Sequence, residues 1–107
     1  MRKLLQASLA ALMIGAAGFA CAAEHVVEIS NNMFMPEVLR IKVGDTVRWV
    51  NQEKRTTHSV LFKEPSVFES ERFFPGESWS HRFEKPGKVV YSCGPHPEMR
   101  GTIDVTE

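Results

Sequence analysis

Apolar and polar side chains alternate with a period of two along most of the chain from His25 onward. This is the period of a strand with one buried face, because successive side chains of a strand point to opposite faces. Turn-forming Gly, Pro, Asn and Asp residues separate the alternating runs. The runs that predict strands are 27–29, 39–43, 46–50, 60–62, 79–83, 89–91 and 103–105.

Many short strands with turns between them predict an all-β sandwich or barrel of about seven to eight strands. No window of 11 residues carries the 3.6-residue period of an amphipathic helix. The segment 65–74 has room for a helical turn at most. No repeat or low-complexity tract divides this part of the chain, so we expect one β domain.

Residues 1–23 follow a different pattern, that of a secretory signal peptide. Arg2 and Lys3 precede an uncharged apolar run over 4–19, and small residues follow at 20–23. The run is shorter than the roughly 18–20 residues that span a bilayer, which argues against a membrane anchor. The sequence therefore predicts a signal peptide over 1–23 and an exported, periplasmic domain over 24–107. Cleavage after Ala22 and cleavage after Ala23 both satisfy the small-residue rule.

Export makes the cysteine count informative. Either cleavage removes Cys21 and leaves Cys93 as the only cysteine. A free thiol in an oxidising compartment tends to be oxidised or paired, so a bound metal would explain why it is there. A lipid on Cys21 is the alternative, but the residues before it lack the aliphatic side chain that such signals carry.

The segment 91–101 holds the chemistry, because it places three soft or borderline metal ligands at three-residue intervals. These are the thiolate of Cys93, the imidazole of His96 and the thioether of Met99. Pro95 and Pro97 prevent a regular helix or strand there, which stiffens the loop. One thiolate, imidazoles and a weak thioether form the ligand set of a blue-copper site. We therefore expect one copper ion.

A second imidazole must come from elsewhere in the chain, and His25, His58 and His81 are the candidates. His58 lies between the strand ending near Asn51 and the strand predicted over 60–62. A residue at that point can meet the Cys93 loop across the end of a sandwich. His58 is therefore the predicted fourth ligand.

The same segments resemble the cupredoxins, the family that includes amicyanins, plastocyanins and pseudoazurins. The run from Cys93 to Gly101 has the short ligand spacing of amicyanins, and the resemblance extends over most of residues 26–105. It implies a Greek-key β-sandwich, His58, Cys93 and His96 as equatorial ligands, and Met99 as the axial ligand. One position departs from the family, which often has Asn directly after the first ligand histidine. This chain has Ser59 there, whose shorter hydroxyl either replaces or weakens the family's link to the Cys93 loop. The departure puts the potential and the colour of the site in doubt more than the presence of copper.

Other chemistry fits the Cys93 loop less well. Structural zinc uses Cys and His but essentially not Met, so it would need another ligand. A nucleophilic Cys–His pair usually meets across a fold and needs a third group to orient it. We therefore expect no enzyme activity.

The remaining histidines have two interpretations each. His81 shares a strand face with Trp79 and Phe83, which favours a core or edge histidine over a second metal site. Cleavage after Ala22 would give the terminus Ala23-Glu24-His25, whose amine, amides and imidazole could chelate Cu(II) in a square plane. A frayed terminus is the simpler interpretation.

These observations predict a monomeric carrier of single electrons that cycles copper between Cu(I) and Cu(II). A c-type cytochrome or a periplasmic dehydrogenase would dock transiently at the ring of His96, which we expect to lie nearer the surface than His58. The mature chain, with 11 basic and 13 acidic residues, has no basic stripe that indicates nucleic-acid binding. The alternative is a copper-binding protein that buffers or delivers the metal, which Met33, Met35 and His25 would favour if they formed a second, looser site.

Overall fold

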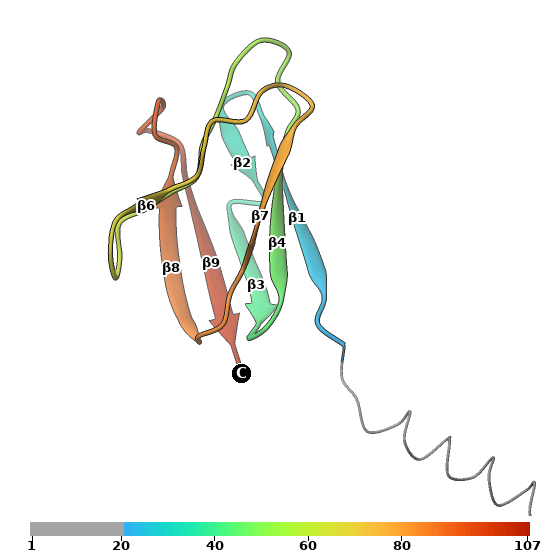
Figure 1. The fold of residues 1–107 in the computed structure, drawn as a ribbon, viewed down its shortest axis with the longest axis vertical. Coiled ribbons are helices and arrows are strands. Elements are labelled where there is room, and N and C mark those ends of the chain that lie inside the picture. The colour runs from blue at the N-terminus through green and yellow to red at the C-terminus, as the bar shows by residue number, and fades with distance from the viewer. Residues whose placement is uncertain (1–20) are drawn as a thin grey trace, which may run out of the picture.

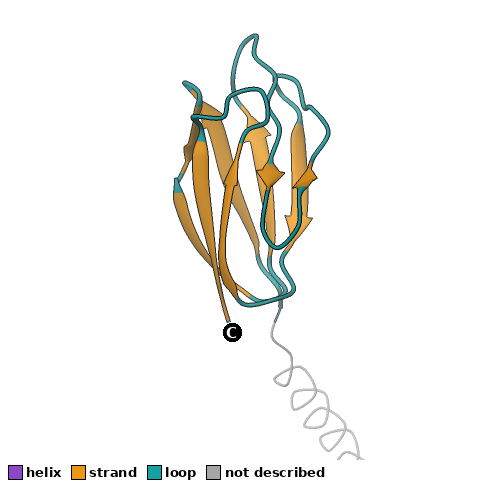
Figure 2. Ribbon diagram, turned by 90° about the vertical axis from the view of Figure 1, so that its left-hand side faces the viewer, coloured by secondary structure: helices purple, strands orange, loops and turns teal. Residues whose placement is uncertain are grey.

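Nine β-strands build two facing sheets in the computed structural model, which describes residues 21–107. The predicted signal peptide lies almost entirely outside the described residues. The first sheet has the order β2 (Met33–Met35), β1 (Glu24–Ser30), β4 (Thr46–Asn51) and β7 (Ser78–Arg82). The second has the order β3 (Val38–Lys42), β9 (Arg100–Thr106), β8 (Gly87–Ser92), β5 (Leu61–Phe62) and β6 (Phe68–Glu69). Figure 2 shows the two sheets as separate layers.

The chain crosses between the sheets repeatedly, which confirms the predicted β-sandwich. It passes from β2 in the first sheet to β3 in the second and returns to β4. As a result β1 pairs with β4 in parallel and β3 pairs with β9 in parallel, while the other pairs are antiparallel. Such crossing connections are those of a Greek-key sandwich.

The strand count exceeds the seven to eight predicted because two further strands are very short. β2 has three residues and β6 has two. Runs of this length cannot show a period of two. β6 lies within the segment 65–74, where the sequence left room for a helical turn. The described residues contain no helix. None of them therefore forms a helix that could cross a membrane.

The predicted alternation places the core between the sheets. Val47 and Trp49 of β4 are fully buried, and Ile103 and Val105 of β9 belong to the same buried cluster. Trp49 lies at the centre, with its ring centroid 5.3 Å from that of Tyr91 and 6.4 Å from that of Phe83. Aromatic rings at these separations contribute packing energy beyond simple burial of area. The core therefore fixes β4, which leads into the connection that contains His58, and β8, which leads into the Cys93 loop.

Candidate metal centre

The Cys93 loop lies at the end of the sandwich opposite the C-terminus, between β8 and β9 (Figure 1). Backbone bonds close it from within, because the Met99 amide donates to the His96 carbonyl at 2.9 Å. The Cys93 amide donates to the Met99 carbonyl at 3.3 Å. Pro95 and Pro97 have no amide hydrogen to offer to other partners. The loop thus holds its three predicted ligands on one short turn that is closed by backbone hydrogen bonds.

His58 reaches the same end of the sandwich from the long connection between β4 and β5. It forms an isolated bridge with Phe73, in which each backbone amide donates to the other's carbonyl, at 3.2 and 2.9 Å. The buried side chain of Asn51 secures this arrangement by donating to the carbonyls of Thr56 and Phe73, at 2.8 and 3.1 Å. The His58 backbone is therefore held in place by Phe73 and Asn51.

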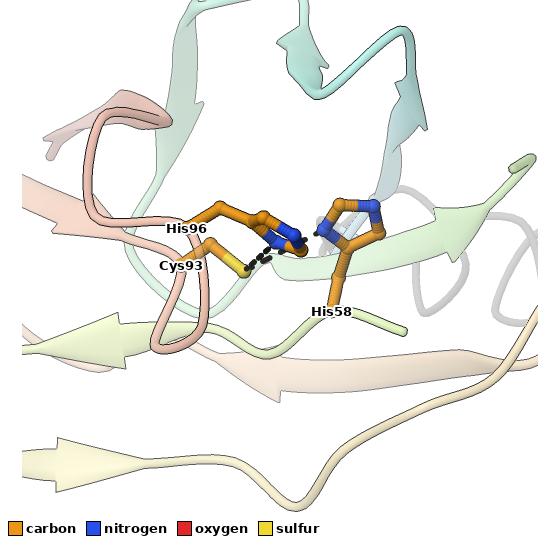
Figure 3. Close-up of side chains that lie close together, drawn as sticks. All are labelled: His58, Cys93 and His96. Atoms are coloured by element: carbon orange, nitrogen blue, oxygen red, sulfur yellow. Dashed lines mark hydrogen bonds between the residues drawn. The ribbon is translucent and has the colours of Figure 1, made fainter. Parts of the chain in front are cut away.

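The structure brings the donor atoms of His58, Cys93 and His96 within 4.8 Å of one another (Figure 3). The Cys93 Sγ atom lies 3.5 Å from His58 Nδ1 and 3.6 Å from His96 Nδ1. Three donors spaced evenly around one ion at bond lengths of about 2.0–2.3 Å would be separated by roughly 3.5–4 Å. The donors are already spaced for a single transition-metal ion.

Three of the four predicted ligands are buried, and His96 is the exception. His58 and Cys93 are fully buried, and Met99 is nearly so as part of the hydrophobic core. His96 is half-buried, and Pro97 beside it is exposed. This confirms the prediction that His96 lies nearer the surface than His58.

Burial sets the protonation of the two innermost groups. It raises the pKa of the Cys93 thiol, although the Ser59 amide donates to its sulfur at 3.4 Å and lowers that pKa in part. Burial also lowers the pKa of His58, which favours the neutral imidazole. Neutral imidazole is the form that binds a metal, and a bound cation would take the place of the thiol proton.

Glu53 orients the buried ligand histidine and was not anticipated from the sequence. Its Oε2 atom lies 3.2 Å from His58 Nε2 and also accepts the Asn32 amide at 2.8 Å. A carboxylate can only accept hydrogen bonds and cannot donate them, so His58 Nε2 carries the hydrogen. His58 Nδ1 therefore offers its lone pair toward Cys93. An acidic residue five positions before His58, in an irregular loop, gives no sequence signal for this contact.

Ser59 forms a link to the Cys93 loop at the position where the family often has Asn. Its hydroxyl accepts the Gly94 amide at 3.0 Å. The same hydroxyl contacts the Glu69 carboxylate at 2.6 Å. A shorter side chain therefore makes the connection with the help of a second residue.

The other histidines lie away from this cluster. His25 is in β1 at the opposite end of the sandwich, where its Nε2 lies 2.9 Å from Asp45 Oδ2. The backbone of Glu24 and His25 is extended and paired with β4, so wrapping it around a square-planar ion would break that pairing. His81 packs against Trp79 and Phe83, with centroids 5.6 and 4.8 Å away, and burial lowers its pKa. Its position agrees with the core or edge interpretation.

Known proteins resemble this chain in both sequence and fold. A family model described as copper binding proteins of the plastocyanin/azurin family matches residues 19–106. The chain belongs to this family. Amicyanin-alpha of Methylorubrum extorquens is 35% identical over 103 residues, which cover 92% of this chain and 86% of that protein. The crystal structure of amicyanin from Paracoccus versutus has a TM-score of 0.73 at 33% identity, covering 84% of this chain and 87% of that one.

The fold also occurs within a larger enzyme. A Cu-containing nitrite reductase from Thermus scotoductus matches with a TM-score of 0.73 and 34% identity. The match covers 78% of this chain and only 22% of the enzyme chain. The resemblance to the cupredoxins is thus confirmed, and so is copper as the metal of the family.

Proposed function

We propose that this protein is a periplasmic type 1 copper protein that carries single electrons between redox partners. The observation that supports this most directly is the spacing of the three donors, with Cys93 Sγ 3.5 and 3.6 Å from two imidazole Nδ1 atoms. In this proposal His58, Cys93 and His96 are the equatorial ligands and Met99 is the axial one. The bound copper would supply the Cu(I)/Cu(II) couple.

The surrounding residues hold the proposed ligands in a fixed arrangement. Glu53 holds the hydrogen on His58 Nε2, and the Ser59 amide supports the Cys93 sulfur. The internal bonds of the Cys93 loop keep the ligand backbones in one arrangement. Because the ligands do not have to move when the charge of the site changes, the reorganisation energy of electron transfer stays small.

Electrons would enter and leave through the half-buried ring of His96, the ligand nearest the surface. Pro95, Pro97 and exposed Met33 and Met35 would form an apolar surface for brief docking. A c-type cytochrome or a periplasmic dehydrogenase is the proposed class of partner, and the carrier would act as a monomer. Small interfaces suit partners that must separate quickly.

The copper site is tested by its colour. Purified protein with Cu(II) is expected to show a strong thiolate-to-copper band in the visible, and Cys93→Ser is expected to lose it completely. Zinc binding without colour, or equal copper binding by Cys93→Ser, would refute the site. A folded Cys93→Ser variant, checked by circular dichroism, is the control.

Electron transfer is tested separately from copper handling and from catalysis. Fast self-exchange and rapid reduction of cytochrome c by the Cu(I) form would support the carrier. Ready loss of the metal to a small chelator would favour a copper-buffering role, with Met33 and Met35 as further donors. Reduction of nitrite by the purified protein would contradict the expectation that it is not an enzyme.

A further inference from the structure

The carboxylate of Glu69 contacts a buried hydroxyl beside the predicted thiolate. Glu69 belongs to β6, which pairs with β5 so that Glu69 lies opposite Leu61. Backbone and side chain of Ser70 hold β6 in place, because Ser70 donates its amide to the Val60 carbonyl and accepts the Val60 amide, both at 2.9 Å. Glu69 is thereby held against Ser59, whose hydroxyl oxygen is 2.6 Å from Glu69 Oε2.

The hydrogen bonds of the Ser59 hydroxyl can be assigned by counting donors. A hydroxyl has one hydrogen and two lone pairs, whereas a carboxylate can only accept and an amide N–H can only donate. The hydroxyl must therefore accept the Gly94 amide at 3.0 Å and give its own hydrogen to Glu69. The Cys93 sulfur lies next to Ser59, whose amide donates to it at 3.4 Å, so the sulfur is the second acceptor to which the hydroxyl hydrogen could turn.

Gly94 is matched to this contact. A methyl group at position 94 would overlap the Glu69 carboxylate and come within 2.8 Å of the Ser59 hydroxyl oxygen. Its φ is not in the left-handed region, so the backbone there does not demand glycine. The glycine leaves room for Glu69, and three residues distant in sequence fit one arrangement.

We propose that Glu69 is a positioning residue of the metal centre. Its carboxylate takes the hydroxyl hydrogen of Ser59, so that Ser59 accepts from Gly94 and does not donate to the sulfur of Cys93. A hydrogen bond from a hydroxyl would draw electron density from the thiolate and raise the reduction potential. Glu69 therefore keeps the potential lower than Ser59 alone would set it. This inference rests on the proposed copper site.

The test compares Glu69→Ala and Glu69→Gln with Glu71→Ala, an exposed acidic residue of the same segment. Glu69→Ala is expected to raise the reduction potential, shift the visible band to higher energy and speed amide exchange of Gly94 about tenfold. Glu69→Gln offers an amide oxygen to the hydroxyl and is expected to restore the slow exchange. Glu71→Ala is expected to change none of the three.

A second background separates the hydrogen bond from the charge. In Ser59→Ala protein, Glu69→Ala can remove only the negative charge, so the band is expected to stay where Ser59→Ala alone puts it. An equal band shift in both backgrounds would overturn the proposal. Unchanged Gly94 exchange in Glu69→Ala would do the same.

Failure of the copper site itself gives a different result. Gly94 exchange can be measured by NMR in the metal-free protein, where it reports only the Glu69–Ser59–Gly94 contacts. A wild-type protein with no visible band refutes the proposed function, whereas a normal band with insensitive Gly94 exchange refutes the role of Glu69 alone.

Discussion

A histidine is paired with a carboxylate at each end of the sandwich, and the two pairs have different surroundings. At one end His58 Nε2 lies 3.2 Å from Glu53, and at the other His25 Nε2 lies 2.9 Å from Asp45. The His58 side chain is fully buried, while 27% of the His25 side chain is exposed. The second ring nitrogen of His58 faces the sulfur of Cys93.

The His25–Asp45 pair connects the start of β1 to a turn. Asp45 accepts the amides of Ala23 and Lys42 at 2.9 and 3.1 Å besides its contact with His25. It therefore ties the start of β1 to the turn between β3 and β4. The comparison shows that only the histidine at the first end has further metal-binding donors beside its second ring nitrogen.

The largest expected effect comes from removing one histidine at each end. His58→Ala deletes a buried donor and is expected to abolish the strong visible band with Cu(II). His25→Ala is the matched variant and is expected to keep the full band, because His25 lies at the other end of the sandwich. Absorption spectra of both copper-loaded variants test this, and loss of the band in His25→Ala would contradict the assignment.

Glu53→Gln sharpens the comparison at the metal end. It keeps the size of the side chain but weakens the acceptor that holds the hydrogen on His58 Nε2. Loss of such an orienting group typically lowers metal affinity by about 10- to 100-fold. Competition titration with a copper chelator measures this. An affinity equal to that of the wild type would show that the His58 loop needs no carboxylate.

Asp45→Asn tests the opposite end by stability and its pH dependence. The three hydrogen bonds, first among them that from the Ala23 amide, lower the pKa of Asp45 from 3.8 to about 2. A depressed carboxyl pKa stabilises the fold fully above pH 3.8, and that contribution is lost as the pH falls toward 2. We expect Asp45→Asn to melt below the wild type at pH 7 and the difference to shrink as the pH falls from about 4 through 2. The visible band at pH 7 is expected to stay unchanged.

The smallest expected effect is that of His25→Gln. Asp45 keeps its two backbone donors in this variant, so the shift in Tm at pH 7 is expected to be smaller than for Asp45→Asn. A partly buried pair that keeps its other hydrogen bonds contributes little to Tm, on the order of a few degrees at most. Thermal melts of the two variants side by side decide it, and a larger loss in His25→Gln would reverse the roles of the two residues.

The long alternating strands were predictable because their side chains face either core or solvent. Trp49 and Tyr91, which lie in the alternating runs 46–50 and 89–91, are buried in the core. β2 and β6 were not predictable, because two or three residues are too few to show a period. Their pairing depends on the strands already beside them.

The sequence by itself determined three ligands of the candidate site. Cys93, His96 and Met99 lie within one Pro-stiffened loop, so their proximity follows from chain length alone. It also narrowed the remaining ligand to three histidines and favoured His58. Only the tertiary structure showed that His58 lies 3.5 Å from the sulfur and that His25 is at the far end.

The contacts that tune the site were decided by tertiary structure alone. Glu53 reaches His58 from an irregular loop, and Glu69 reaches Ser59 from a two-residue strand. Such contacts carry no spacing rule, because they join segments whose approach is set by the packing of two sheets. The residue types and spacing of the Cys93 loop therefore predict copper, and the packing of the two sheets decides how the proposed ligands are held.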